Sequence, residues 1–288
     1  MSSKLQNWLL VVLITLIWGS SFILMKRGLV AFSPTQVAAA RLFIAALVTI
    51  PLFFRYYTKL SLRELRYIVL IALCGNGIPP FLFTAAQKHL NRSISGILNS
   101  TTPLFTLLLG ITAFGVSFKL NRLLGVLIGL SGAIFLVLNN GNITDTGNYQ
   151  YGLLIILATL LYSISANTVK KYCQNIPPAA INLGSFSLLI IPSGIILFSG
   201  NFVQTVVTHP SGYVTLGYLV ILAAVNTVIA NLLFYRLTQR TDAIFASVIT
   251  YLIPLVSVGL GFLDGETISW QYFVSMAVIL LGVYLAQK

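Results

Sequence analysis

The sequence predicts an all-α integral membrane protein with ten transmembrane helices, arranged as two inverted repeats of five helices each. Of its 288 residues, 57% are hydrophobic and only 8% are charged, whereas about 25% of the residues in a soluble domain are charged. Ten apolar runs approach the length of about 20 residues with which a helix crosses a bilayer. Motifs of the first five runs return in the last five in the same order.

The apolar runs define the predicted helices and the two repeats. The first five runs cover residues 7–27, 34–55, 65–87, 93–115 and 121–139, and the last five cover residues 150–171, 179–199, 213–237, 243–262 and 270–286. The predicted domains are a first repeat at residues 7–139, an outside linker at residues 140–149 and a second repeat at residues 150–286. Because no small-x-small cleavage site closes the first run, we interpret it as a transmembrane helix rather than as a signal peptide.

Basic residues stand singly or in pairs at the ends of the runs, although the net charge is +12. This spacing is typical of topology signals and does not form the basic face of a nucleic-acid binder, so no nucleic-acid partner is predicted. If the N-terminus is cytoplasmic, 12 basic residues lie inside and 4 lie outside, with Arg41 left uncounted. The inside residues are Lys4, Arg55, Lys59, Arg63, Arg66, Lys119, Arg122, Lys170, Lys171, Arg236, Arg240 and Lys288, and the outside residues are Lys26, Arg27, Lys88 and Arg92. Both termini are therefore predicted to be cytoplasmic.

The two halves share motifs. Residues 15–27 read TLIWGSSFILMKR and residues 159–171 read TLLYSISANTVKK. The matched pairs later in the halves are Pro103 with Pro254, Gly110 with Gly261, and Asn76 with Asn226. Because five is an odd number, the second half enters the membrane from the opposite side, an arrangement typical of secondary transporters with a site near mid-membrane. The alternative is a duplication that only built a stable bundle.

These motifs resemble a known family. WGSSFILMKRGL, followed by Pro34 and AARLFIAAL, is similar to the EamA family of the drug/metabolite transporter (DMT) superfamily, as are GVSFKLNRLLGVLIGLSGAIFL and GETISWQYFVSMAVILLGVYL at the ends of the halves. The resemblance covers nearly the whole chain and implies a ten-helix, multi-pass exporter of amino acids or other small metabolites in the inner (plasma) membrane. The glutamate that the family usually carries in the closing segment is Glu266 in the second half but Val116 in the first, which leaves any charge pairing by that residue in doubt there.

A polar stripe in the fourth helix is a candidate lining of a substrate site. Its members, spaced by four, three and four residues, are Ser95, Asn99, Thr102 and Thr106, and their counterparts in the ninth helix are Ala246, Thr250, Ile253 and Ser257. Such spacing places all four side chains on one helix face. We expect Asn99 to bind substrate, with hydrogen bonding between packed helices as the alternative role of the stripe.

The segment CGNGIPP at residues 74–80 predicts a helix break in mid-membrane. Gly75 and Gly77 flank Asn76, and Pro79 and Pro80 lack backbone N–H donors. Irregular backbone at that depth is tolerated only against protein or a water-filled cavity. The segment therefore marks the expected binding region, with Asn76 and its counterpart Asn226 as substrate-binding candidates; the alternative is a kink that serves helix packing alone.

Aromatic and basic residues complete the predicted site. Trp18 and Tyr162 occupy equivalent mid-helix positions and are expected to stack on a substrate, as is Tyr251. The alternative for these rings is plain packing between helices. Arg41 lies about 10 Å below the outer face by helical rise. Its counterpart in the second half is Ser185. We expect Arg41 to attract an anionic group of the substrate, with Lys26 assisting at the outer end, and snorkelling to the membrane surface is the alternative.

Missing residue types restrict the chemistry. The five acidic residues, Glu64, Asp145, Asp242, Asp264 and Glu266, all fall in loops or at helix ends, which disfavours cationic substrates. Two cysteines and two histidines offer no disulfide framework or metal site, and no cofactor is expected. The leading hypothesis is an exporter of neutral, zwitterionic or anionic metabolites. The alternatives are a carrier of nucleotide-like or sugar-phosphate anions, a membrane enzyme, which lacks catalytic groups in the helices, and a non-transporting scaffold.

Overall fold

The computed structural model describes residues 3–56, 61–90, 92–140, 150–263 and 270–286. Every regular element in this part of the chain is a helix. The first are α1 (Ser3–Gly28), α2 (Pro34–Tyr56), α3 (Leu62–Ile71), η2 (Ala72–Gly77), α4 (Ile78–Gln87), α5 (Arg92–Asn99), α6 (Thr102–Thr112) and α7 (Leu120–Asn140). The others are α8 (Gln150–Tyr172), α9 (Pro178–Phe198), α10 (Phe202–Thr208), α11 (Gly212–Ala223), η3 (Ala224–Ile229), α12 (Ala230–Arg240), α13 (Ala243–Ser247), α14 (Ile249–Leu263) and α15 (Trp270–Ala286).

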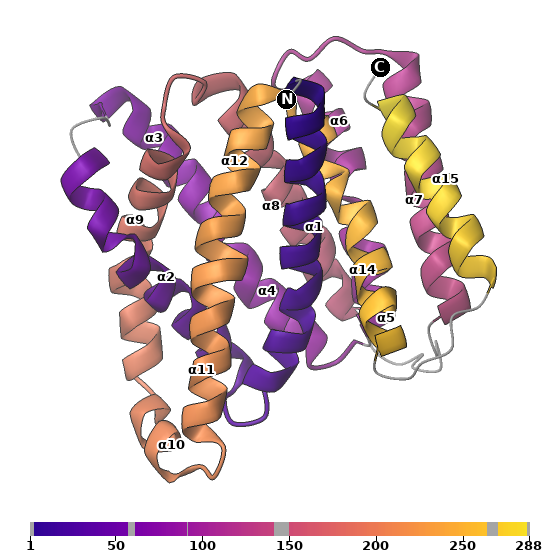
Figure 1. Cartoon of the computed structure of the whole chain (residues 1–288). Coiled ribbons are helices and arrows are strands. Elements are labelled where there is room, and N and C mark those ends of the chain that lie inside the picture. Colours follow the sequence, from indigo (N-terminus) through magenta and orange to yellow (C-terminus); the bar gives the residue numbers. More distant parts are fainter. Residues whose placement is uncertain (1–2, 57–60, 91, 141–149, 264–269, 287–288) are drawn as a thin grey trace.

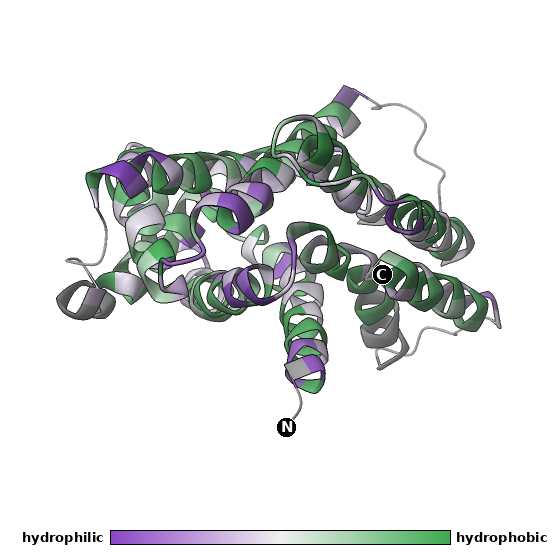
Figure 2. Ribbon diagram, turned by 90° about the horizontal axis from the view of Figure 1, so that it is seen from above, coloured by the Kyte–Doolittle hydropathy of each residue, from purple (hydrophilic) through white to green (hydrophobic). Residues whose placement is uncertain are grey.

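The helices have the length and composition of membrane spans. Six helical stretches are long and apolar enough to cross a bilayer, and four shorter apolar helices accompany them. Large apolar side chains remain exposed on the outside of the bundle, such as Leu153 at 69% and Ile191 at 71%. Figure 2 shows that the helices are mostly hydrophobic along their length. The prediction of an all-α membrane protein is confirmed.

Two π-helical turns, η2 and η3, interrupt long helices at similar places in the two halves. The first joins α3 to α4 and the second joins α11 to α12. Pro79 and Pro80 lie in the first turn of α4, where their missing N–H groups do not disrupt the helix that follows. A π turn accommodates one extra residue within a helix and is frequent at functional sites. The predicted break at Gly75, Gly77, Pro79 and Pro80 thus coincides with η2 and the start of α4.

The fourth and ninth predicted helices are each divided, which corrects the prediction of one continuous helix over residues 93–115 and over residues 243–262. The first is divided between α5 and α6, and the second between α13 and α14. Pro103 in the first turn of α6 has no N–H to donate to the carbonyl of Asn99. That carbonyl instead accepts the hydroxyl of Thr102 at 2.7 Å.

The two halves of the chain interlock. Helix α1 packs against α11, α12 and α14, whereas α8 packs against α3, α4, α5 and α6. Helix α2 packs against α9 on one side of the bundle, and α7 packs against α15 on the other (Figure 1). Each of these contacts joins the first half to the second. Helix α1 begins and α15 ends at the same end of the bundle (Figure 1).

Glycines allow α7 and α15 to approach closely. A Cβ atom added at Gly282 would lie 2.6 Å from the Cα atom of Gly129, and one added at Gly132 would lie 3.0 Å from the backbone nitrogen of Ile279. Contacts of this kind leave no space for a side chain. Close backbone approach is how membrane helices gain packing energy when lipid surrounds them.

We predict that Gly282→Ala lowers the melting temperature of the purified protein in detergent, because overpacking of this kind costs roughly 1–3 kcal/mol. Gly217→Ala is the matched control, since no atom lies within 4 Å of its added Cβ. The control should melt at or slightly above the temperature of the unmodified protein. Equal melting temperatures for Gly282→Ala and the unmodified protein would contradict the assigned role of the helix contact.

Candidate functional site

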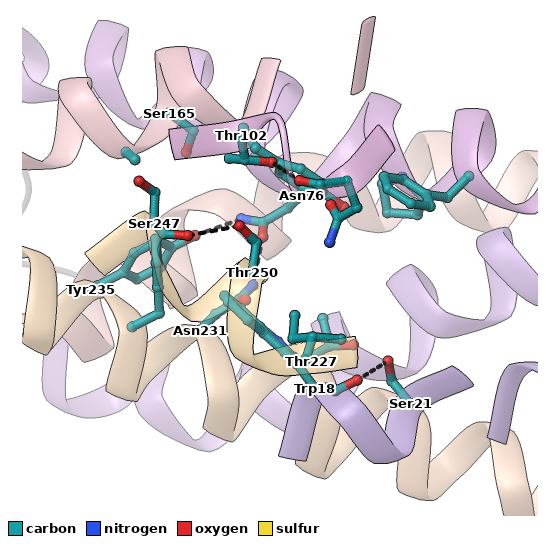
Figure 3. A pocket seen from close by; sticks show the side chains of 18 of the residues that line it. Trp18, Ser21, Asn76, Thr102, Ser165, Thr227, Asn231, Tyr235, Ser247 and Thr250 are labelled. Carbon is teal, nitrogen blue, oxygen red and sulfur yellow. Dashed lines mark hydrogen bonds between the residues drawn. The ribbon is translucent and has the colours of Figure 1, made fainter. Parts of the chain in front are cut away.

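A cavity with a volume of about 140 Å³ lies inside the bundle. A single buried water needs roughly 10–15 Å³ of such volume, so the cavity has room for several waters. Its walls come from α1, α2, η2, α4, α5 and α6 of the first half and from α8, η3, α12, α13 and α14 of the second. Figure 3 shows polar and aromatic side chains converging on it, with Trp18 and Thr227 across from Thr102 and Ser165.

Arg41 lines this cavity from α2. Its Nε donates a hydrogen bond to the Oγ1 of Thr227 at 2.6 Å. The Thr227 hydroxyl in turn donates to the carbonyl of Leu222 at 2.9 Å, five residues earlier at the end of α11. The π turn thus fixes an acceptor that orients the guanidinium into the bundle. Within the described residues, the other N–H groups of Arg41 have no protein hydrogen-bond partner and no ion pair.

The counterpart of Arg41 in the second half has a different environment. Ser185 is fully buried in α9. Its hydroxyl has no hydrogen-bond partner, and it does not line the cavity. Among the described lining residues, the cationic side chain therefore comes from the first half alone.

An amide network ties the two halves along the cavity wall. Asn76 in η2 donates from Nδ2 to the hydroxyl of Tyr235 at 3.0 Å. Its Oδ1 accepts a hydrogen bond from the Nδ2 of Asn231 at 2.6 Å. Both partners lie in α12, so Asn76 uses both ends of its amide to join η2 to that helix. The three side chains line the cavity together (Figure 3).

Aromatic rings form much of the remaining wall. The indole of Trp18 lies 5.2 Å from the ring of Phe234, and its Nε1 donates to the carbonyl of Asn226 at 3.1 Å. On the other side, Tyr162 lies 6.1 Å from Phe83. Tyr162 and Arg41 both line the cavity. Because the polar tip of Trp18 is already bonded, its ring face is the part available to another molecule.

The polar stripe of the fourth helix divides between two roles. Thr106 donates to the Oγ of Ser163 at 3.1 Å, and Asn167 donates to the carbonyl of Thr106 at 3.0 Å. These bonds join α6 to α8 away from the cavity. Asn99 and Thr102 line the cavity instead, and the Asn99 side chain has no hydrogen-bond partner among the described residues.

Three residues predicted to bind or attract the substrate lie outside the cavity lining. Asn226 is the third residue of η3, whereas Asn76 is the fifth residue of η2, and a shift of two positions turns a side chain to another face. The Asn226 amide accordingly donates to the carbonyl of Ile17 and to the Oγ of Ser20 in α1. Tyr251 is fully buried against α7, where its hydroxyl donates to the carbonyl of Val126 at 2.8 Å. Lys26 is exposed at the end of α1.

The predicted helix break contributes two of its residues to the lining. Gly75 and Pro80 face the cavity, whereas Gly77 and Pro79 do not line it. A Cβ atom at Gly75 would lie 3.1 Å from the Cβ of Ser165, so the glycine permits η2 to approach α8 closely. The glycine therefore serves the shape of the cavity as well as the break.

The eighth predicted helix, which the structure divides into α11, η3 and α12, contains lining residues that the sequence analysis did not identify. Thr227, Asn231 and Tyr235 follow one another at intervals of four residues and all line the cavity. This is the same helical spacing that identified the stripe of the fourth helix. The signal was thus present in the sequence, although the chemical variety of the three side chains made it less conspicuous.

An all-helical membrane bundle whose two halves enclose a polar and aromatic cavity has the features of a membrane transporter. The sequence matches the EamA-like transporter family over residues 7–138 and 151–287, and the chain belongs to this family. It is therefore a membrane transporter of the EamA type.

Named relatives and a solved structure resemble the chain over most of its length. The uncharacterized inner membrane transporter YedA of Escherichia coli K12 is 27% identical over 280 residues, which cover 94% of this chain and 87% of the relative. The probable amino-acid metabolite efflux pump of Salmonella typhimurium LT2 is 25% identical over 291 residues, which cover 97% and 94% of the two chains. A crystal structure of another protein has the same fold, with a TM-score of 0.73 at 19% identity over 98% of this chain and 96% of the other.

We predict that Asn167→Leu and Asn99→Leu differ in their effect on thermal stability. Asn167 is buried and donates to two carbonyls, so its loss should cost roughly 0.6–2 kcal/mol and lower the melting temperature in detergent. Asn99→Leu should melt near the unmodified protein, because the removed amide bonds no described residue. A larger loss of stability in Asn99→Leu than in Asn167→Leu would reverse the two assigned roles.

Proposed function

We propose that this protein is a secondary transporter that exports small metabolites, such as amino acids, by alternating access. The observation that carries the proposal is the cavity formed by both halves, into which Arg41 presents N–H groups without a protein partner. A buried guanidinium is costly in a membrane unless it is paired or hydrated. An anionic group of a substrate would supply the missing partner.

Two inverted repeats of five helices provide the mechanism in this proposal. The order α3–η2–α4 in the first half matches α11–η3–α12 in the second. The contacts are also repeated when each helix is replaced by its counterpart in the other half. The contacts of α1 with α11, α12 and α14 then become those of α8 with α3, α4 and α6. The pairs α2–α9 and α7–α15 remain the same pairs. This pattern supports repeats at residues 7–139 and 150–286. The linker between them falls almost wholly outside the described residues.

The charge of the lining favours a substrate with a single anionic group. Of the described residues that line the cavity, Arg41 is the one cation and none is acidic. Apolar groups such as Phe83, Phe234 and Ile253 face the rest of the space. A zwitterionic or monoanionic metabolite with an apolar part fits this lining, and the efflux-pump name of one relative points to the same class. A nucleotide-like or sugar-phosphate anion ranks second, because several phosphate charges call for more than one basic residue.

Both termini are assigned to the cytoplasm in this proposal. The 12 inside basic residues against 4 outside support the orientation. The start of α1 and the end of α15 at the same end of the bundle are consistent with it (Figure 1). Of the described acidic residues, Glu64 caps α3 and Asp242 caps α13, so neither enters the cavity.

We predict that Arg41→Gln raises the KM for anionic and zwitterionic substrates about tenfold or more, because a hydrogen bond to a charged group is lost. Arg41→Lys should retain much of the transport, since it keeps the charge. The measurement is counterflow into liposomes with purified protein and a panel of amino acids, nucleosides and organic anions. Arg27→Gln is the matched control, because Arg27 is exposed and lies outside the lining.

Equal KM values for Arg41→Gln, Arg41→Lys and the unmodified protein would remove the arginine from the site. Exchange of multiply charged anions alone would favour the second-ranked substrate class. Absence of saturable exchange for every compound of the panel would favour the non-transporting scaffold.

We predict that a cysteine at Gly200 reacts with an impermeant maleimide in intact cells, whereas a cysteine at Phe118 reacts only after permeabilisation. Both positions are exposed and lie at opposite ends of the proposed topology. The native thiols of Cys74 and Cys173 are buried. Burial, and to a smaller extent the nearby Glu64 carboxylate, raises the pKa of the Cys173 thiol to about 12 and keeps it unreactive near neutral pH. The reverse labelling pattern would invert the topology.

A further inference from the structure

Side chains from α8 and α12 close one end of the bundle. Lys170 near the end of α8 donates from Nζ to the carbonyl of Gln239 at 3.2 Å and to the carbonyl of Thr241. Gln239 returns two hydrogen bonds from Nε2, to the carbonyls of Cys173 at 2.6 Å and Ile176 at 2.8 Å. The Gln239 carbonyl lies in the last turn of α12, and the carbonyls of Thr241, Cys173 and Ile176 lie in the segments that follow α12 and α8. We call Lys170 and Gln239 with these carbonyls the α8–α12 latch.

The same two residue types occupy the equivalent positions of the first half. Lys26 and Lys170 share one position in the repeated motif, and each precedes by eight residues the proline that begins the next helix. Gln87 and Gln239 each follow the first residue of their π turn by fifteen residues. The repeat therefore places Lys26 and Gln87 at the other end of the bundle, where α1 and α4 end.

These counterparts are not bonded in the structure. Lys26 is exposed and forms no hydrogen bond or ion pair within the described part of the chain. The Nε2 of Gln87 is buried without a hydrogen-bond partner. A buried amide nitrogen without an acceptor is costly and calls for an explanation. The partners that the repeat assigns to it are the carbonyls of Leu29 and Phe32, the equivalents of Cys173 and Ile176.

The cavity extends toward the unlatched end. Met25 on α1 lines it, whereas its counterpart Val169 on α8 is fully buried in an apolar cluster with Ile68, Cys173 and Tyr235. At the latched end, α13 packs against both α6 and α8, and α12 packs against α8. Of the equivalent pairs at the other end, α5 contacts α14, whereas α5 with α1 and α4 with α1 make no such extended contact among the described residues. The helices are thus packed more extensively at the latched end than at the other end.

We propose that Lys170 and Gln239 form the gate at one end of the transport pathway and that Lys26 and Gln87 form the gate at the other, each latch closing when the opposite one opens. The structure holds the state in which the α8–α12 latch is closed. In the other state Lys26 donates to the carbonyls at the end of α4, and Gln87 donates to those of Leu29 and Phe32. This inference rests on the proposed alternating access. A latch present in only one of two states shifts their equilibrium by its own free energy.

The test measures the reactivity of a reporter cysteine, Val169→Cys, in the full-length protein in lipid nanodiscs. Its reaction rate with a maleimide reports the population in which the α8–α12 end is open, and the same variants without the reporter give the background. Lys170→Met should raise the rate about tenfold, the factor typical for loss of a hydrogen bond from a charged donor. Lys26→Met should lower it by a similar factor, because it destabilises the opposite state.

The neighbouring residues provide matched controls. Lys171 lies 5.4 Å from the ring of Tyr172, and neither it nor Arg27 takes part in a latch. Lys171→Met and Arg27→Met remove the same charge, so they should leave the rate unchanged. Gln239→Leu should act in the same direction as Lys170→Met. If both variants raise the maleimide rate while their melting temperatures stay near that of the unmodified protein, the rate reports gate opening rather than unfolding.

Opposite shifts for Lys170→Met and Lys26→Met, with unchanged controls, would support the proposal, because a merely structural lysine would not produce opposite signs. Shifts in the same direction, or shifts no larger than those of the controls, would overturn it. The readout needs no substrate, so it is independent of the liposome assay. Opposite shifts in the maleimide rate, together with no substrate exchange in liposomes, would reject the proposed transport but keep the two latches. Substrate exchange without opposite shifts would reject the latches and keep the transport.

Discussion

The hydrocarbon core of a bilayer supplies no hydrogen-bond partners, and this constraint decides where each polar group of the bundle lies. Where α6 and α8 meet without a cavity, Thr106 and Ser163 are hydrogen-bonded to each other. Arg41 and Asn99, which retain unused hydrogen-bonding capacity among the described residues, face the cavity, whereas the unpaired Ser185 hydroxyl in α9 is an exception that lies outside it. Helix α6 therefore has a paired polar face toward α8 and a polar face that lines the cavity, and the boundary between them outlines the site.

The two π turns place both kinds of polar group, those paired between helices and those lining the cavity, in the middle of the predicted membrane spans. Each turn widens one helix and changes the direction of the side chains that follow it. In η3 the Thr227 hydroxyl donates to the carbonyl of Leu222 at the end of α11 and accepts a hydrogen bond from Arg41. In η2 the amide of Asn76 reaches across to α12. The irregular backbone of each π turn therefore also supplies a side chain that bonds the other half of the chain.

Hydrophobic run length, charge bias and repeated motifs were sufficient to predict the helical membrane class, because these quantities follow directly from bilayer thickness and desolvation cost. Trp18, Asn76 and Tyr162 were placed at the cavity by the repeat and by the helix break. Asn226 was misplaced because the two asparagines match in the sequence but differ by two positions within their π turns. Tyr251 could not be distinguished from a lining residue, since Gly129, which leaves room for its ring, belongs to α7, far away along the chain. The division of the fourth helix depended on competition for one carbonyl beside Pro103, which periodicity does not reveal.

The difference between Arg41, which lines the cavity, and its counterpart Ser185, which does not, has a consequence for assemblies built from a single repeat. A symmetric dimer presents every residue twice. Two copies of the first half would therefore direct two guanidinium groups into one small space, where like charges repel, and two copies of the second half would direct none. Joining the halves in one polypeptide removes that restriction, because each half can then diverge independently. An odd number of charges in the chamber is available to a covalently fused pair and is unattainable for identical protomers related by a two-fold axis.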